Sequence, residues 1–468
     1  MTSRPRDGVR DRVDAPSLNA ARAAPVYRGA PVLGALADLR YYLLCTLVRA
    51  EGAEPVVRFR IAAGVPIRSF GVFSPEGAAQ VLAGPGDYRK DSRPYVETRA
   101  FFGNGLLTSQ DEVWRRQRRF VAPLFSPRRL ESEYVPILVE EAARMREDWR
   151  ASPEATADVH ALSVAYTLRA IGRLLFGTEL EDVLPRLGPV FARANGYLNA
   201  RVTTASLVPR TWPTPTNRVG KAARRDLYAI VDELIAQRRA SAGEGGDLLG
   251  RLLAESDPET GEPLSADEVR DQALIFLLAG HETTATALAF TVQLLARHPQ
   301  VQARVQDEVS AVWPDGRPAG DVVRATPYTQ QVLKEALRLY PPAYAISRYT
   351  AHGDVVADTV IPPRSNVFVA TFALHRSAQV WPNPLRFHPE RFDPAEVASR
   401  HRMAWLPFGA GAHVCVGAQL AAAELTVALA HLLTHFAMVP AAEATVPPTA
   451  SGLVLRPAAP MPHSLRRR

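Results

Sequence analysis

One of only two cysteines in the 468-residue chain, Cys415, lies in the sequence Phe408-Gly409-Ala410-Gly411-Ala412-His413-Val414-Cys415-Val416-Gly417. It directly precedes residues 417–425, whose pattern predicts the start of a strong helix. A thiol at a helix N-terminus meets the positive end of the helix dipole, which favours the thiolate. The three glycines at 409, 411 and 417 allow sharp turns and close approach to a flat partner. The stretch therefore predicts a thiolate presented to a soft metal centre as an axial ligand.

These ten residues resemble the haem-ligand signature of cytochromes P450, Phe-x-x-Gly-x-Arg/His-x-Cys-x-Gly, at every fixed position. The resemblance implies that Cys415 is the iron ligand, that Phe408 and Gly417 border the cofactor, and that His413 contacts a haem propionate. It also implies a mainly α (α+β) fold, with a large helical domain, a small β-sheet region and one noncovalent haem b (iron protoporphyrin IX). The alternative is a buried structural cysteine in a Gly-rich loop.

Composition favours a large soluble-type core and excludes several classes of protein. Apolar residues make up 47% of the chain, and no window reaches the roughly 18–20 apolar residues that span a bilayer, so we expect no membrane span. Two cysteines cannot form a disulfide framework, which indicates a reducing cytoplasm. The formal charge is +7, but the arginines are scattered and no basic stripe is interleaved with aromatic residues, so we expect no nucleic-acid partner.

The pattern of breaks predicts one large domain. Residues 1–29 are rich in Arg, Asp and Ala and are expected to be a disordered lead-in to a single domain over residues 30–468. Residues 55–61 and 67–73 alternate as a hairpin, and 355–361 and 366–370 are expected to join the same small sheet. Residues 84–109 are predicted to be loop-like. No flavin or ferredoxin domain is expected to be fused to the chain.

A long helix is predicted from a capping box at residues 265–268 to about residue 297. In its middle, Ala279 and Thr283 lie one turn apart on the same face, with Gly280 and Glu282 beside them. This resembles the Ala/Gly-Gly-x-Asp/Glu-Thr pattern of P450s, which implies that Ala279 and Gly280 border the haem and that Glu282 and Thr283 deliver protons during catalysis. The alternative is a core helix with an incidental glycine. His281 is expected to face outward or to support the helix, and not to bind metal.

Three positions predict a clamp for carboxylates. Trp114 and Arg118 share one face of a helix over residues 110–121, and an indole N–H beside a guanidinium suits a carboxylate. The pair resembles the Trp-x-x-x-Arg of P450s and implies binding of the haem propionates, a role that Arg348 also takes by resemblance. A Trp packed beside a surface Arg is the alternative.

Glu335 and Arg338 are spaced i, i+3 among leucines. Such a pair contributes little when exposed, but a buried pair needs every hydrogen bond to be made. The resemblance to the Glu-x-x-Arg and Pro-Glu-Arg-Phe segments of P450s implies that Arg391 completes a structural triad behind the haem.

The resemblance implies a monooxygenase that uses O2 and receives electrons from a separate ferredoxin and its NAD(P)H-dependent ferredoxin reductase. Arg115, Arg116 and Arg119 are either a docking surface for that donor or solvated charges. An apolar pocket predicts an apolar substrate, such as a terpene or polyketide-type natural product of secondary metabolism. Alternatives are a fatty-acid hydroxylase, a peroxide-driven P450 peroxygenase, and a haem carrier or sensor. The expected pocket residues are Phe101, Phe102, Leu107, Phe276, Leu277, Ala343 and Ile346.

Overall fold

The computed structural model describes residues 22–467 except for residues 28, 31–33, 53, 63, 65, 178–182, 204–207, 241–246 and 258. Residues 1–21 of the predicted lead-in lie outside this range. Strands β1 (Arg22–Ala23) and β2 (Val26–Tyr27) pair with later strands, so sheet structure begins before the predicted domain start at residue 30.

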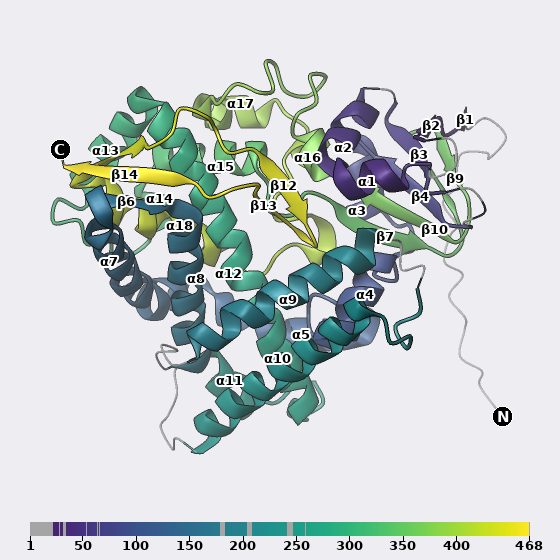
Figure 1. The fold of residues 1–468 in the computed structure, drawn as a ribbon, viewed down its shortest axis with the longest axis horizontal. Helices are drawn as coiled ribbons and strands as arrows, with labels where there is room; N and C mark the ends of the chain where they lie inside the picture. The colour runs from purple at the N-terminus through teal and green to yellow at the C-terminus, as the bar shows by residue number, and fades with distance from the viewer. Residues whose placement is uncertain are drawn as a thin grey trace, which may run out of the picture.

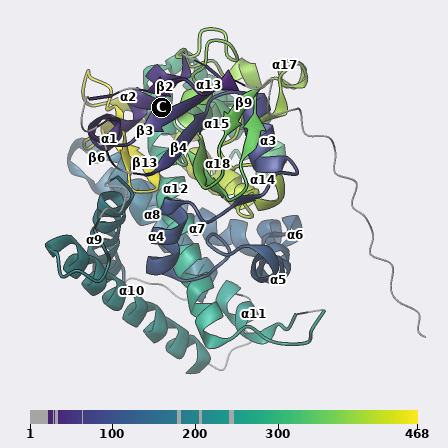
Figure 2. The ribbon, with the colours of Figure 1, turned by 90° about the vertical axis from the view of Figure 1, so that its right-hand side faces the viewer.

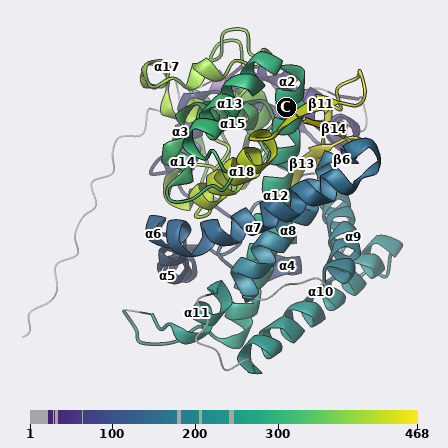
Figure 3. The same cartoon turned by 90° about the vertical axis from the view of Figure 1, so that its left-hand side faces the viewer.

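Helix α12 (Ala266–Arg297) runs through the middle of a mostly helical molecule (Figure 1). Its capping box forms as predicted, because the Ser265 side chain accepts from the Glu268 N–H and the Glu268 carboxylate accepts from the Ser265 N–H. Helices α8 (Val159–Phe176) and α18 (Ala418–Leu433) pack beside it (Figure 3).

Contrary to the expectation from sequence, α12 is long and apolar enough to cross a membrane by length and composition, with a mean hydropathy of 1.4. However, 83% of that apolar window is buried inside the protein. The helix is apolar on all sides because other helices surround it, which is the pattern of a core helix.

Two of the sheets lie at one end of the molecule, and the sheet that contains β6 and β14 lies at the opposite end (Figure 1). One sheet has the order β2-β3-β4-β10-β7-β5, and the predicted hairpin forms it centrally as antiparallel β3 (Val56–Arg60) and β4 (Arg68–Val72). The prediction for residues 355–361 was wrong in one respect. The segment forms two strands, β8 (Asp354–Val356) and β9 (Thr359–Ile361), because Ala357 and Asp358 both have positive φ and turn the chain back on itself. These two strands form a separate sheet with β1.

Residues 84–109 are not a loop throughout, which corrects a second expectation. They contain β5 (Tyr88–Arg89) and the ten-residue helix α4 (Arg93–Phe102). Pro94 lies in the first turn of this helix, and Gly103 follows its last residue with φ 83°. Helices α9 (Leu184–Thr203) and α10 (Pro215–Ala240) pack against each other, and α9 also packs on α4 (Figure 2).

The remaining elements complete the helical part and its edge strands. The helices are α1 (Leu36–Tyr41), α2 (Leu43–Glu51), α3 (Pro75–Ala83), α5 (Asp111–Val121), α6 (Pro127–Arg129), α7 (Val135–Ala151), α11 (Leu248–Ala254), α13 (Pro299–Val312), α14 (Val322–Ala325), α15 (Pro327–Leu339), α16 (Thr371–Leu374) and α17 (Pro394–Ala398). The strands are β6 (Thr156–Asp158), β7 (Ile346–Thr350), β10 (Ser365–Val369), β11 (Phe436–Pro440), β12 (Pro448–Ser451), β13 (Val454–Pro457) and β14 (Pro462–Arg467).

Candidate functional site

The loop that carries Cys415 is shaped by two glycines. Gly409 and Gly411 have φ of 72° and 70°, and a Cβ at Gly411 would lie 2.1 Å from the Leu82 carbonyl oxygen. Only glycine fits such a position without strain. Gly417, with φ −88°, has no such requirement and is the residue immediately before α18. The sequence argument for sharp turns therefore holds at two of the three glycines.

Cys415 is an exposed residue, although many protein atoms lie near its thiol. The Cys415 N–H donates to the Phe408 carbonyl oxygen at 2.9 Å, which holds the loop closed. Burial raises the pKa of the Cys415 thiol, while the Gly417 N–H and the Arg118 charge lower it. The helix N-terminus alone thus does not produce the predicted thiolate, because desolvation outweighs it. A bound metal cation would supply the missing positive charge.

One edge of α12 stays open although the helix is otherwise buried. Ala279 is exposed and Gly280 and Thr283 are partly exposed, whereas the residues on either side of them are buried. The Thr283 hydroxyl donates to the Ala279 carbonyl oxygen at 2.7 Å. Ala279 and Thr283 therefore border open space inside the fold, as expected for a helix that faces a flat group. A Cβ at Gly280 would instead lie 2.9 Å from the Ile171 side chain of α8, so Gly280 allows α8 to approach α12.

A single aromatic ring links this helix to the cysteine loop. The Phe125 ring lies 5.9 Å from the Phe276 ring of α12, centroid to centroid. The same ring is the closest group, at 3.9 Å, to the place where a Gly417 Cβ would lie. The loop that carries Cys415 and helix α12 therefore both lie close to the Phe125 side chain.

Glu282 is buried and held by two residues that the sequence did not indicate. It forms an ion pair with Arg456 of β13 and accepts from Asn195 Nδ2 of α9 at 3.1 and 3.3 Å. Both partners are far from Glu282 in the chain, and no local pattern marks them. The neighbouring His281 is buried and bonds the Leu277 carbonyl through Nδ1, so of the two expected arrangements it supports the helix and does not face outward.

A second buried carboxyl group, that of Glu424, also contacts helix α12. Glu424 of α18 is enclosed by protein, and burial raises its pKa to about 8 although a hydrogen bond from Thr284 lowers it. The sequence analysis missed this residue, because a Glu among alanines in a helix carries no motif.

Four basic groups converge beside the cysteine loop. Burial lowers the pKa of His413 to about 3, with Lys90, Arg348 and Arg118 adding to the effect. Burial and the charges of Arg348, Arg99 and Arg118 lower the pKa of Lys90 to about 7. In the part of the chain that the structure describes, His413 Nδ1 is buried without a hydrogen-bond partner, and no ion pair with a carboxylate is recorded for any of the four.

The charges of Arg118 and Arg348 lower the pKa of both Lys90 and His413, and an anion beside the cluster would offset this repulsion. The Trp114 ring packs 4.2 Å from the His413 ring, and Arg118 Nη1 donates to the Val414 carbonyl at 3.1 Å, so both predicted clamp residues reach the loop. The two propionates of haem have the required charge, and the residues present therefore fit this group. Lys90 is a further member that the sequence analysis missed.

The predicted triad comes together behind the site. Arg338 binds both oxygens of Glu335, at 2.6 and 2.8 Å, and Arg391 Nε lies 3.4 Å from Glu335 Oε1. The Arg338 side chain and that of Glu335 are fully buried. Arg338 also donates to three backbone carbonyls between residues 375 and 386, which satisfies the demand that burial makes.

The structure separates the predicted pocket residues into two groups. Leu107, Ala343 and Ile346 are partly exposed, and Phe276 lies three residues from Ala279 on α12. Phe101, Phe102 and Leu277 are instead packed in the hydrophobic core, with at most 2% of each residue exposed. Leu277 lies two residues from Ala279, about 200° around the helix, so it points away from the open edge.

Two of the three candidate docking arginines have structural partners. Arg116 pairs with Asp257 and Glu268, and Arg119 pairs with Asp257, so both fix the segment before α12. Arg115 is exposed and pairs with Glu112 in its own helix. A docking role is therefore open only to Arg115 among the three.

The family model described as "Cytochrome P450" matches residues 51–463. The chain is 33% identical to the cyclooctat-9-en-7-ol 5-monooxygenase of Streptomyces melanosporofaciens, covering 80% of this chain and 81% of that protein. It is 31% identical to the pentalenene oxygenase of Streptomyces avermitilis, covering 86% and 88%. Among solved structures, the heme domain of cytochrome P450DA superposes with a TM-score of 0.84 at 28% identity, over 96% of this chain and 98% of that one.

Proposed function

The chain belongs to the cytochrome P450 family and is a haem-dependent monooxygenase, and from this premise we propose that it oxidises an apolar small molecule of the terpene or polyketide type. The observation that carries the proposal is the arrangement around Cys415. The exposed Cys415 lies in a loop beside four basic groups that an anion would stabilise, and the Phe125 ring lies near both Gly417 and Phe276 of α12.

Each residue at the site has a role that its contacts support. Cys415 would hold the iron, and Trp114, Arg118, Arg348, His413 and Lys90 would hold the propionates. A haem with a thiolate ligand supplies the activation of O2. Thr283, already bonded to the Ala279 carbonyl, would position a proton donor on the open edge of α12. Glu282, which Arg456 and Asn195 hold in place, would supply protons to it.

The apolar character of the substrate is supported by the side chains near the open edge. Phe276, Leu107, Ala343 and Ile346 offer carbon surface and no charge. Two relatives are named for oxygenation of cyclooctat-9-en-7-ol and pentalenene, which supports a terpene-like substrate and a place in secondary metabolism.

We further propose that electrons come from a separate ferredoxin and its NAD(P)H-dependent reductase, and that the protein works in the cytoplasm. The exposed Cys415 supports the second proposal, because a reducing compartment keeps such a thiol available for iron.

The test uses the purified haem-loaded protein with a panel of apolar terpenoids and polyketide-type scaffolds. We expect at least one compound to change the haem spin state and to give a product containing one oxygen atom from 18O2. The Thr283→Ala variant should still bind that compound but convert a smaller share of the NAD(P)H consumed into product. Turnover of the native protein with hydrogen peroxide alone that matches its turnover with the redox chain would favour a peroxygenase. An unchanged product yield in Thr283→Ala would favour a carrier or sensor.

A further inference from the structure

A cavity of about 450 Å³ lies where α4, α9 and the segment after α9 meet. Neither the sequence patterns nor the haem site accounts for it. The lining residues come from the first turns of α4, from the last turn of α9 and from the chain just before α10, namely Arg93, Val96, Glu97, Arg201, Pro209 and Arg210.

The charges around this cavity do not balance. Arg201 binds the Glu97 carboxylate with two bonds, at 2.9 and 3.0 Å, and this pair is about 95% buried. Arg210 Nε lies 3.8 Å from the same carboxylate. No carboxylate within ion-pair distance of Arg93 is recorded among the described residues. Among the described residues that line the cavity, three guanidinium groups against one carboxylate give a surplus of two positive charges.

The surroundings of the Arg93 guanidinium also favour an anion. Its side chain is only partly exposed, and burial lowers its pKa, as does the nearby charge of Arg201. An anion in the cavity would remove that penalty. The first turn of α4 contains no acidic residue, so the positive end of the helix dipole adds to the same field.

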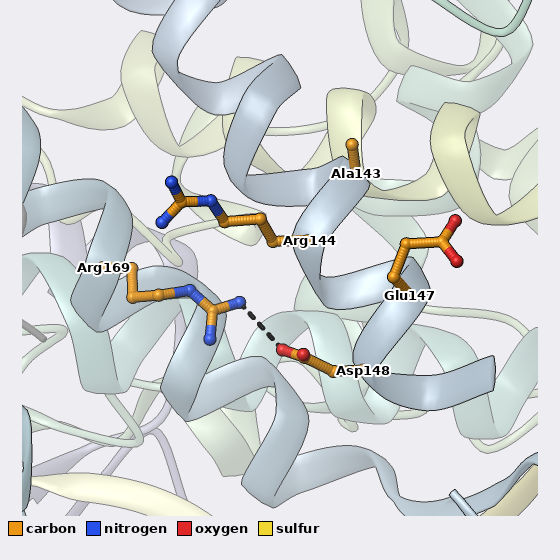
Figure 4. A pocket seen from close by; sticks show the side chains of 5 residues that line it. All are labelled: Ala143, Arg144, Glu147, Asp148 and Arg169. Atoms are coloured by element: carbon orange, nitrogen blue, oxygen red, sulfur yellow. Dashed lines mark ion pairs between the residues drawn. The ribbon is translucent and has the colours of Figure 1, made fainter. Parts of the chain in front are cut away.

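A second cavity provides a comparison on the same molecule. It measures about 360 Å³ and lies between α7 and α8 (Figure 4). Arg144 and Arg169 line it together with Glu147 and Asp148, and Arg169 pairs with Asp148 at 3.3 Å. Two positive groups against two negative groups leave no surplus charge, so this cavity has no comparable attraction for an anion.

Helix α9 connects the charged cavity to helix α12. Arg201 follows Asn195 by six residues, which is about 9 Å of helix rise, and Asn195 bonds Glu282 beside Thr283. The Phe101 ring of α4 lies 5.7 Å from the Tyr197 ring of α9, so apolar side chains pack between the two helices that line the cavity. An anionic group in the cavity would therefore lie against a helix, α9, that also contacts Glu282 of α12.

We propose that the cavity between α4 and α9 binds the carboxylate of the substrate, with Arg93 and Arg210 as its ligands and the Glu97–Arg201 pair as its floor. A planar guanidinium fork matches a carboxylate with two parallel hydrogen bonds. The inference rests on the proposed function and narrows it, because the substrate becomes an apolar carboxylic acid.

The experiment compares acids with their uncharged esters. The haem spin state of the purified haem-loaded protein is titrated with dodecanoic acid, abietic acid and the methyl ester of each. We expect the better acid to bind at least about tenfold tighter than its ester. The double variant Arg93→Gln/Arg210→Gln should lose this preference while its affinity for the ester stays within about twofold. Arg225→Gln, an exposed arginine of α10, is the matched control and should keep the preference.

Other outcomes would overturn the inference. Equal affinities of acid and ester, or an acid preference that survives in the double variant, would show that the cavity does not read the substrate's charge. If sodium sulfate raises the melting temperature of the native protein but not of the double variant, and acids show no preference, then the cavity binds a free anion instead. A response to neutral terpenes without any response to acids would leave the proposed function standing. Failure of every apolar compound to change the spin state would overturn the proposed function as well.

Discussion

Lys90 is the residue whose charge depends most on what lies beside Cys415. Its pKa of about 7, lowered by burial and by three arginines, means that much of the side chain is neutral just above neutral pH. Propionates favour the protonated form, so binding of haem takes up a proton, and haem affinity should fall as the pH rises above about 7 toward the ordinary lysine pKa near 10.4.

Lys90→Met should abolish that part of the pH dependence and weaken haem binding about tenfold at pH 7, since a hydrogen bond to a charged group contributes about 1.5 kcal/mol or more. Transfer of haem to apomyoglobin, followed from pH 6.5 to 9, measures both effects. Lys221→Met, at an exposed position of α10, serves as the control. A Lys90→Met protein with the native affinity and the native pH profile would show that Lys90 does not contact the propionates.

Arg456 is the residue that keeps the buried Glu282 paired. Breaking a buried ion pair leaves one charge without a partner, and Arg456→Met should therefore lower the free energy of unfolding by about 3 kcal/mol. The product formed per NAD(P)H should also fall, because the carboxylate beside Thr283 loses its position. Urea denaturation and product analysis measure the two effects. Arg456→Lys keeps the charge but not the fork, so it should fall between the native protein and Arg456→Met.

At the scale of elements, the end of α4 depends on one glycine. Gly103 has φ 83°, and a Cβ there would lie 2.0 Å from the Asp271 carboxylate, which accepts from the Asn104 N–H at 2.6 Å. Gly103→Ala should lower the free energy of unfolding by about 3 kcal/mol, from backbone strain and from the displaced carboxylate. Gly261→Ala has a similar φ and no neighbour within 4 Å, so it should cost only about 1 kcal/mol. Equal melting temperatures of the two variants would contradict this account.

The elements predicted well from sequence are those with local signals at both ends. The limits of α12 agree closely with the prediction, because a capping box begins it and His298-Pro299 follows its end. Helix α4 was missed because two of the four residues on its buried face, Glu97 and Thr98, are polar, so the face shows no apolar helical period. The residues Lys90 and Arg456 were missed for a different reason, since only the packing of distant segments brings them to the site.

At the scale of the whole molecule, the Glu335 carboxylate joins α15 to the irregular chain that precedes the cysteine loop. It accepts from Arg338, pairs with Arg391 and accepts from the His388 N–H at 3.0 Å. These contacts connect the helical part to residues 375–391, so their loss should affect the entire fold and not one helix.

Two ion pairs of the same spacing separate burial from geometry. Glu335–Arg338 is fully buried, whereas Glu112–Arg115 has the same i, i+3 spacing and the same shortest distance of 2.6 Å on an exposed face. Glu335→Gln should lower the free energy of unfolding by about 3–5 kcal/mol and reduce the haem content of the purified protein, because a buried arginine loses its charged partner. Glu112→Gln should change stability by less than about 1 kcal/mol. Guanidinium denaturation and the ratio of haem to protein absorbance provide both readings. A Glu335→Gln protein as stable as Glu112→Gln would show that Arg338 is held by the backbone carbonyls alone.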